Sequence, residues 1–310
     1  MRVIRGLTHL EPLQQGCLLT IGNFDGVHLG HQAVIHKLAQ HAKTLNLPVV
    51  VMIFEPQPLE YFLKADAPPR LMRLREKVSQ FNRLPVNDLL VLKFNQHFAN
   101  LEADAFIQHI LLEKLNVKHL VVGDDFHFGK ARRGNFALLQ AAGLRYGFTV
   151  EDTCSTIVEG LRVSSTAIRQ ALASGDLAKV EQLLGRPYSI CGRVIKGEQL
   201  GRTLGYPTAN IQLSRKNSPL SGVFAVLMTG LNGRQIRGVA NVGTRPTVTG
   251  EKNVILETHL FDFDDNCYGQ AVEVHFMKKL RDEQHFASLN DLKAQIAKDA
   301  IAANAFFLST

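Results

Sequence analysis

No stretch of this sequence is apolar for the roughly 20 residues that a membrane-spanning helix needs. The first residues, Met1–Gly6, lack the hydrophobic region of a secretory signal peptide, and the sequence shows no repeats or low-complexity tract. No Cys-x-x-Cys pair occurs among the widely spaced cysteines, which are Cys17, Cys154, Cys191 and Cys267. Their spacing favours reduced thiols over disulfides. These absences predict a cytoplasmic protein with no membrane partner.

The composition is typical of a globular protein with room for two domains. The chain has 310 residues, of which 45% are hydrophobic. A formal net charge of +7 suits anionic ligands. The basic residues are scattered, however, and the densest group, Lys130–Arg133, lies beside glycines in an expected loop. Phosphorylated small molecules account for this charge as well as nucleic acid does, so charge alone leaves both open.

The strongest chemical signal is the segment Thr20–Gln32, which holds three glycines and two histidines. It follows an apolar run, Cys17–Ile21, that predicts a buried strand. Helical spacing follows it, with apolar residues at Ala33, Val34, Leu38, Ala39, Ala42 and Leu45. Open α/β sheets bind ligands at such strand ends, and a helix start offers N–H groups to phosphate. Glycines let the backbone approach a ligand closely.

His28 and His31 are three residues apart, so both rings can reach one site at the start of the helix. An alternative is a metal-binding pair, and another is two solvated surface histidines. The strand before the turn and the helix after it favour a phosphate site. The pattern resembles the His-x-Gly-His signature of nucleotidylyl transferases.

The first half of the chain alternates predicted strands with predicted helices. Near-continuous apolar or β-branched runs predict strands at Val49–Phe54, Asp88–Phe94, His119–Val122 and Thr149–Val158. Helical spacing is expected at residues 72–84, 102–115 and 136–146. This order predicts a parallel sheet with both faces covered. The serines and threonine in Val163–Arg169 are typical of a helix cap, and Asp176 is expected to cap a short helix.

The periodicity changes after Gly185-Arg186-Pro187, which predicts a boundary between domains 1–185 and 186–310. Short β-branched segments separated by turns follow, at residues 190–195, 222–228, 235–242, 254–259 and 271–276. Such segments predict a small antiparallel barrel. One amphipathic helix is expected at the end, capped by Ser288 and with a face made of Leu289, Leu292, Ile296 and Ala300.

A second chemical signal is the segment Lys196–Asn210. Its glycines, flanked by basic residues, suit a loop that binds phosphates; they are Gly197, Gly201 and Gly205. Thr208 and Asn210 share one face if the segment is extended, and such hard oxygen ligands suit Mg²⁺. No Gly-Lys-Ser/Thr closes the segment, so it is not a Walker motif. A glycine-rich hairpin turn is the alternative.

The order of these motifs resembles that of the bacterial bifunctional riboflavin kinase/FAD synthetases, over essentially the whole chain. The first half carries Gly22–His31, Gly123–Gly129 and Ser164–Arg169. The second half carries Gly205–Asn210, Ser221–Ala225, Asn241–Thr247, Glu257–Phe261 and Leu280–Glu283. The chain departs from the family at His127 and Asn135, where arginine and aspartate are common.

The resemblance implies a barrel domain that phosphorylates riboflavin with ATP to give FMN, with Mg²⁺ as the metal. In that domain Thr208 and Asn210 would bind the metal, and Glu257 would be the general base. The resemblance assigns the nucleotide to Lys196, Gly197, Gly201 and Gly205. Arg281, and Asp125 in the other domain, would contact the flavin. From pattern alone, Glu257 is equally well a cross-strand partner on an exposed face.

The first domain would be a Rossmann-like nucleotidylyl transferase that adenylylates FMN to FAD and releases pyrophosphate. The FMN phosphate attacks ATP directly, so no enzyme nucleophile is needed. His28 and His31 would stabilise the charge that grows on the triphosphate. The remaining nucleotide contacts are expected from Gly22, Asn23, Phe24, Asp25, Ser164, Ser165, Thr166 and Arg169.

Two other functions compete with this hypothesis. A transferase with another acceptor would leave the loop Pro207–Asn210 and Glu257 unexplained. A nucleotide-binding regulator or RNA-binding protein without catalysis would have lost His28, His31 or Glu257, and all three are present. The expected partners are therefore riboflavin, FMN and ATP, with no nucleic acid, and the sequence carries no signal for the oligomeric state.

Overall fold

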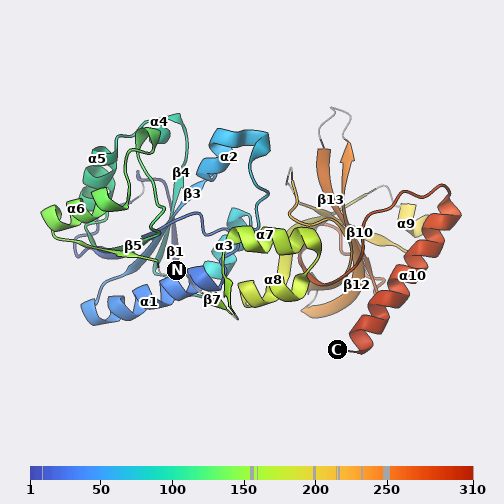
Figure 1. Cartoon of the computed structure of the whole chain (residues 1–310). Helices are drawn as coiled ribbons and strands as arrows, with labels where there is room; N and C mark the ends of the chain where they lie inside the picture. Colours follow the sequence, from blue (N-terminus) through green and yellow to red (C-terminus); the bar gives the residue numbers. More distant parts are fainter. Residues whose placement is uncertain are drawn as a thin grey trace. The chain divides into compact units, whose positions relative to one another are not determined.

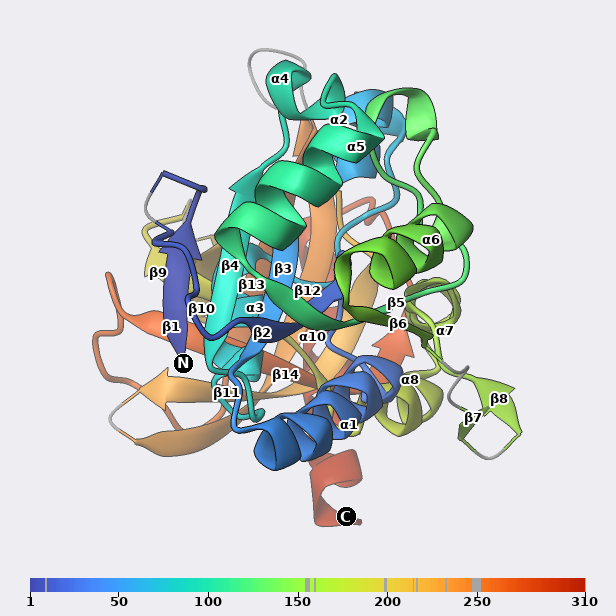
Figure 2. The ribbon, with the colours of Figure 1, turned by 90° about the vertical axis from the view of Figure 1, so that its left-hand side faces the viewer.

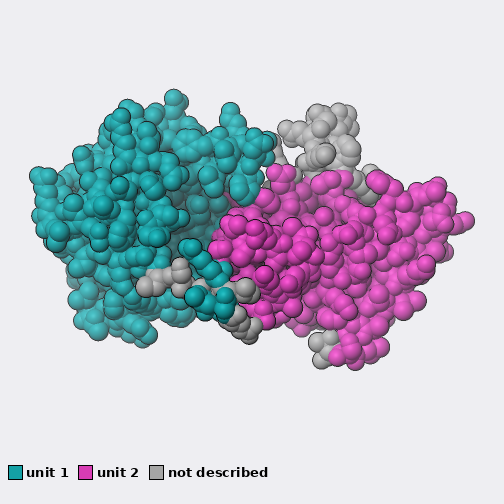
Figure 3. All heavy atoms as spheres, viewed as in Figure 1, with its two compact units in different colours: residues 1–68, 72–163 teal, residues 69–71, 164–310 magenta. Residues whose placement is uncertain are grey.

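The computed structural model describes residues 1–8, 10–153, 157–158, 160–197, 200–213, 215, 217–231, 233–246 and 252–309. The chain forms two compact units (Figure 3). Unit 1 comprises residues 1–68 and 72–163, and unit 2 comprises residues 69–71 and 164–310. Among the residues described in either unit, no helix is both long and apolar enough to cross a membrane.

Unit 1 is built on a six-stranded parallel sheet with the strand order β1-β4-β3-β2-β5-β6 (Figure 2). The strands are β1 Arg2–Arg5, β2 Cys17–Ile21, β3 Val49–Glu55, β4 Asp88–Lys93, β5 Val117–Val122 and β6 Thr149–Asp152. From β2 the chain continues to β3 on one side and later returns to β5 on the other. The strand order therefore reverses between β2 and β5, which is where α/β sheets bind ligands.

Helical segments surround this sheet (Figure 1). They are α1 Leu29–Leu45, α2 Pro58–Leu63, η1 Lys64–Asp66, α3 Leu74–Phe81, α4 Gln96–Ala99, α5 Ala103–Ala105, η2 Phe106–Lys114, η3 Lys130–Arg132 and α6 Phe136–Tyr146. Segment η2 has π-helical spacing and continues directly from α5. A short hairpin, β7 Ile157–Val158 with β8 Leu161–Arg162, follows the sheet.

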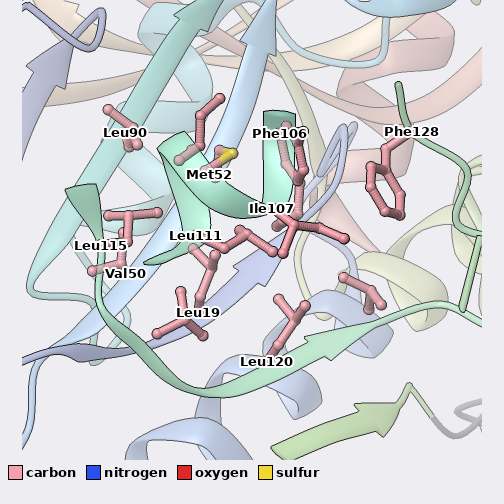
Figure 4. Close-up of a cluster of buried hydrophobic side chains, with 14 of the residues drawn as sticks. Leu19, Val50, Met52, Leu90, Phe106, Ile107, Leu111, Leu115, Leu120 and Phe128 are labelled. Carbon is pink, nitrogen blue, oxygen red and sulfur yellow. The ribbon is translucent and has the colours of Figure 1, made fainter. Parts of the chain in front are cut away.

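Alternate residues of the strands are buried in two different clusters. Leu19 belongs to the cluster of Figure 4, where Met52 and Leu90 from neighbouring strands meet Phe106 and Leu111 from η2. The preceding residue, Leu18, packs instead with Leu38 and Ala39 of α1. Because successive side chains of a strand point to opposite faces, the sheet is covered on both faces, as the sequence predicts.

Unit 2 is a closed antiparallel barrel with the strand order β10-β13-β12-β11-β14-β9, which confirms the predicted barrel. Its strands are β9 Tyr188–Ile195, β10 Thr208–Gln212, β11 Gly222–Leu231, β12 Arg234–Pro246, β13 Lys252–Leu260 and β14 Ala271–Arg281. The helices of this unit are α7 Ser165–Ser174, α8 Leu177–Leu184, α9 Leu200–Thr203 and α10 Leu289–Leu308. Ser164, Asp176 and Ser288 cap α7, α8 and α10 through their side chains, as expected.

The compact units divide between Val163 and Ser164, because α8 packs on β9 and β14 and so groups with the barrel. The segment 69–71 also belongs to unit 2. Tyr188 donates a hydrogen bond to the Leu71 carbonyl at 2.9 Å, and Arg169 Nε donates to the Pro69 carbonyl at 2.8 Å. The change of periodicity at Gly185 thus marks the start of the barrel strands, and the functional boundary predicted there stays a prediction.

The structure differs from the sequence-based expectations in four places. The strand expected at Thr149–Val158 is not continuous: β6 ends at Asp152, residues 154–156 lie outside the described residues, and Ile157–Val158 belong to the separate hairpin strand β7. The neighbouring β5 ends at Val122, whose carbonyl accepts from the Thr153 N–H at 3.0 Å. The helix expected at 72–84 is shorter, and β1 was not predicted because its apolar core is only Val3 and Ile4. The buried face of α1 includes Ile35, whereas Ala33 and Leu45 are exposed.

Leu111→Ala should lower the free energy of unfolding of unit 1 by about 2–5 kcal/mol, because Leu111 is completely buried and the change leaves a cavity. Leu144→Ala is the matched control, since Leu144 is 91% exposed and its loss should change stability by at most about 0.5 kcal/mol. Urea unfolding followed by circular dichroism measures both. Equal midpoints for the two variants would contradict the packing described.

Candidate active sites

The loop after β2 joins the sheet to α1 and carries the first group of predicted residues. Its conformation is strained, because Phe24 and Val27 have positive φ angles of 47° and 42°. Asp25, which is 2% exposed, accepts a hydrogen bond from the Met72 N–H at 3.0 Å. The predicted residue Asp25 therefore holds the loop in place from inside the unit.

Lys77 of α3 contacts the same loop from the interior of unit 1. Its side chain is fully buried, and its Nζ donates to the Asn23 carbonyl at 2.7 Å. Phe81, on the same helix, packs edge-on against Phe24 with ring centroids 5.6 Å apart. A buried ammonium is costly unless it is well paired, so this contact ties α3 firmly to the loop.

The two histidines lie together at the start of α1. His28 Nδ1 accepts a hydrogen bond from the His31 N–H at 3.3 Å, and the rings stack 3.6 Å apart. Since Nδ1 of His28 is an acceptor, the proton of the neutral ring is on Nε2. His31 Nδ1 is buried and makes no hydrogen bond to the described residues. A buried polar atom without a partner is typical of a place where a ligand completes the bonding.

Burial lowers the pKa of the His31 imidazole well below its ordinary value of 6.5, and the neighbouring His28 and Lys77 lower it further. His31 is therefore neutral at physiological pH. In the unfolded chain the His31 imidazole becomes protonated near pH 6.5, whereas in the folded protein it does not. The contribution of His31 to stability is therefore lost as the pH falls below that value.

The loop after β5 carries Asp125, which is exposed. Strand β5 pairs with β2, with Thr20 opposite Val121, so this loop and the His28 loop lie at adjacent strand ends. His127 Nδ1 donates to the Asp125 carbonyl at 2.7 Å. Asn135 caps α6 by accepting from the Leu138 N–H at 2.9 Å.

Ser164, Ser165, Thr166 and Arg169 start α7 in unit 2. Ser164 Oγ accepts from the Ala167 N–H at 3.2 Å, which is the capping role that the sequence also offered. Arg169 uses its Nε on the Pro69 carbonyl. The role of these residues in binding phosphate stays a prediction.

Unit 2 contains a pocket of about 260 Å³ that brings together five of the predicted residues: Gly201, Thr208, Asn210, Glu257 and Arg281. Strand register explains this arrangement. Glu257 of β13 lies opposite Asn210 of β10 on one side and opposite Asn241 of β12 on the other. Leu256 and Thr258, its neighbours in the chain, are buried in the barrel, so Glu257 is on the outer face.

The predicted glycines lie against the predicted metal ligands. A Cβ atom on Gly197 would come within 2.6 Å of both amide heteroatoms of Asn210. One on Gly201 would lie 2.4 Å from the Tyr206 carbonyl oxygen and 3.4 Å from Thr208 Oγ1. Glycine is therefore required where this loop approaches β10. Lys196 and Gly205 are exposed, and Gly205 has a positive φ of 88°.

Arg281 lies at the wall of the pocket and is bound by Asp299 of α10. Its Nε donates to Asp299 Oδ1 at 2.9 Å and its Nη2 donates to Oδ2 at 2.8 Å. The guanidinium also lies over the ring of Phe286, 5.7 Å from its centroid. This two-point ion pair fixes the guanidinium plane and attaches α10 to the end of β14.

Sequence reasoning missed three residues of these sites. Lys77 gave no signal, because a lysine on a short helix is usually exposed. Asp299 did give one, since it falls on the apolar stripe with Leu292 and Ile296. His259 lies in a motif that was singled out, and its Nδ1 donates to the Pro207 carbonyl at 2.9 Å beside Thr208.

Fold and sites together define a class of protein. A parallel α/β unit carries a His-x-Gly-His turn where the strand order reverses between β2 and β5. A separate barrel carries a pocket lined by Glu257 beside a glycine-rich loop. These features are typical of enzymes that act on phosphate-bearing substrates.

Comparison with known proteins identifies the family. The sequence matches two family models, described as FAD synthetase over residues 10–167 and riboflavin kinase over residues 184–307. The bifunctional riboflavin kinase/FMN adenylyltransferase of Haemophilus influenzae is 54% identical over 309 residues, covering 100% of both chains. That of Escherichia coli K12 is 51% identical, covering 99% of this chain and 98% of the relative.

A solved structure described as a macrolide-efflux protein from Streptococcus pneumoniae has a TM-score of 0.80 and 30% identity, and covers 96% of this chain and 97% of that one. The chain therefore belongs to the family of bifunctional riboflavin kinase/FMN adenylyltransferases. The FAD synthetase part precedes the riboflavin kinase part, as the sequence predicts.

Lys77→Met should lower the rate of FMN adenylylation at least about tenfold, because the loop loses one charge-assisted hydrogen bond worth about 1.5–3 kcal/mol. Riboflavin phosphorylation should keep its normal rate. Lys43→Met, on the exposed side of α1, is the control. Separate assays that start from FMN and from riboflavin measure the two rates. Adenylylation as fast as in the control would show that Lys77 does not position the loop.

Proposed function

We propose that Glu257 is the general base of riboflavin phosphorylation and accepts the proton of the ribityl hydroxyl as that oxygen attacks the γ-phosphate of ATP. The observation that carries this proposal is the placement of Glu257 in the pocket, next to Thr208 and Asn210. Its neighbours in register are Asn210 and Asn241.

Thr208 and Asn210 are proposed as the residues that hold Mg²⁺. Their side chains share one face of β10 and stand beside the Glu257 carboxylate, so the donor set is made of hard oxygen ligands. A bound Mg²⁺ would neutralise charge on the ATP phosphates. The glycines 197, 201 and 205, with Lys196, would bind those phosphates through backbone N–H groups and the ammonium.

Arg281 is proposed to position the flavin. Asp299 fixes its guanidinium, and the pocket side of that group lies near Phe286 and the apolar residues Leu292 and Ile296 of α10. A flat apolar ring system fits such a wall. Arg281 would therefore act by holding the wall of the pocket in shape around the substrate.

In the first domain, the FMN phosphate oxygen is proposed to attack the α-phosphorus of ATP. A new P–O bond forms, the bond to the β-phosphate oxygen breaks, and pyrophosphate leaves. His28 and His31 would donate hydrogen bonds to the charge that develops on the triphosphate. Residues 22–25 would build the loop, Asp125 would contact the flavin, and Ser164, Ser165, Thr166 and Arg169 would bind the β- and γ-phosphates.

We also propose residues 1–185 as the adenylyltransferase domain and residues 186–310 as the kinase domain. The family matches, which end at residue 167 and begin at residue 184, support this division. The proposed location is the cytoplasm. Riboflavin, FMN and ATP are the proposed partners, and a nucleic acid is not among them.

His28→Ala combined with His31→Ala should lower FMN adenylylation by at least about 10²-fold, since each lost donor to a developing charge costs roughly 10²–10³ in rate. The kinase rate should stay normal, because that chemistry uses unit 2. His36→Ala, exposed on the same helix, is the control. A parallel fall in both activities would mean that the histidines are structural.

Glu257→Gln should lower FMN formation by about 10²–10⁴, the usual contribution of a general base, because an amide cannot accept the proton. Size and hydrogen-bonding shape are kept, so the melting temperature and conversion of supplied FMN to FAD should hardly change. Glu181→Gln, exposed on α8, serves as the control. A near-normal rate from riboflavin would end the assignment and favour a surface carboxylate.

A further inference from the structure

Three residues that the flavin chemistry does not use meet on the α1 side of the unit 1 sheet. They are His41 of α1, His119 of β5 and Glu151 of β6. One ligand atom of each residue lies within 4.8 Å of the other two. His41 is ten residues after His31 along α1, which is about 15 Å of helix. The cluster is therefore separate from the loop after β2 that carries His28 and His31.

The His119 ring is held on one side by Thr149. Its Nδ1 lies 2.6 Å from Thr149 Oγ1, and that hydroxyl donates its own proton to the Lys118 carbonyl at 3.4 Å. With that hydroxyl bonded to the Lys118 carbonyl, Nδ1 is the donor to Thr149 and Nε2 keeps a lone pair that can bind a metal. Burial lowers the pKa of His119, and the nearby His41 and Lys37 lower it further, against the opposing effect of Glu151. The ring is neutral at physiological pH.

The Nε2 lone pair faces a carboxylate. His119 Nε2 is buried, makes no hydrogen bond to the described residues, and lies 3.4 Å from Glu151 Oε2. The Glu151 carboxyl is ionised, because the hydrogen bond from Lys37 to its other oxygen lowers its pKa. An unprotonated Nε2 and a carboxylate oxygen at this distance are two donor atoms that a single cation can bridge.

The distance between Nε2 and Oε2 matches the distance between two ligands of one metal ion. Two ligand atoms about 2.1 Å from a tetrahedral Zn²⁺ are about 3.4 Å apart, and Nε2 and Oε2 are separated by 3.4 Å. Thr149 and Lys37 hydrogen-bond the far sides of His119 and Glu151, as outer-sphere partners of metal ligands do. The ion pair of Lys37 with Glu151 would form without a metal, but it leaves the buried Nε2 unexplained.

We propose that His41, His119 Nε2 and Glu151 Oε2 bind a divalent transition-metal ion, best matched by Zn²⁺, with water as the fourth ligand. Two imidazoles and one carboxylate suit Zn²⁺ better than Mg²⁺. The ion would connect α1 to β5 and β6, so it would stabilise unit 1 rather than take part in flavin chemistry.

The test uses the full chain, treated with a chelator, dialysed and titrated with Zn²⁺ at pH 7.5 against a chromophoric chelator, without nucleotide. We expect one equivalent to bind, and His41→Ala and His119→Asn each to weaken binding at least tenfold. His36→Ala is the matched control on α1 and should bind as the unaltered chain does. Zinc should raise the melting temperature of the control but not of His41→Ala.

His41→Ala alone keeps the test decisive if His119→Asn fails to fold, because His41 is exposed. The double variant at His28 and His31 checks the other histidine pair. Cobalt in place of zinc should give the visible absorption of a tetrahedral site. An unaltered chain that binds no zinc, His41→Ala that binds it normally, or binding that is lost with His28 and His31 would each overturn the proposal.

Discussion

The register between β10 and β13 places Asn210 opposite Glu257, and the second site depends on it. Side chains alternate between the two faces of a strand, so a slip of one residue would move Glu257 into the barrel interior and bring Leu256 or Thr258 out. Barrel closure prevents such a slip, because β13 is also paired with β12 along its other edge. The strand that carries Glu257 is thus held by backbone hydrogen bonds on both sides.

The first site rests on a different constraint, the order of parallel strands. Strand β2 lies between β3 and β5, so the loops after β2 and β5, which are far apart in the sequence, lie next to each other at the carboxyl ends of the strands. The strained backbone at Phe24 and Val27 is stabilised by packing and hydrogen bonds from α3 and from the Met72 N–H. Strain of this kind persists only where the surroundings hold it in place.

Much of the fold could be predicted because local signals and tertiary packing agree. The caps at Ser164, Asp176 and Ser288 follow from side-chain chemistry, and the apolar runs of β2 and β3 follow from burial on both faces. The end of β6 at Asp152, short of the predicted Val158, has a tertiary cause. A β-branched run continues as a strand only while a neighbouring strand is there to pair with it, and β5 ends at Val122.

By itself, the sequence determined the family, the order of the two activities, the glycine-rich loops and the residue types of both sites. Those features depend on residues that are close in the chain, or on sequence motifs that can be recognised without a structure. The tertiary structure alone decided that the buried Lys77 binds the loop after β2, that Asp299 binds Arg281, and that His41, His119 and Glu151 meet. Each of these contacts depends on which helix packs on which strand, and the packing of the whole hydrophobic core determines that arrangement.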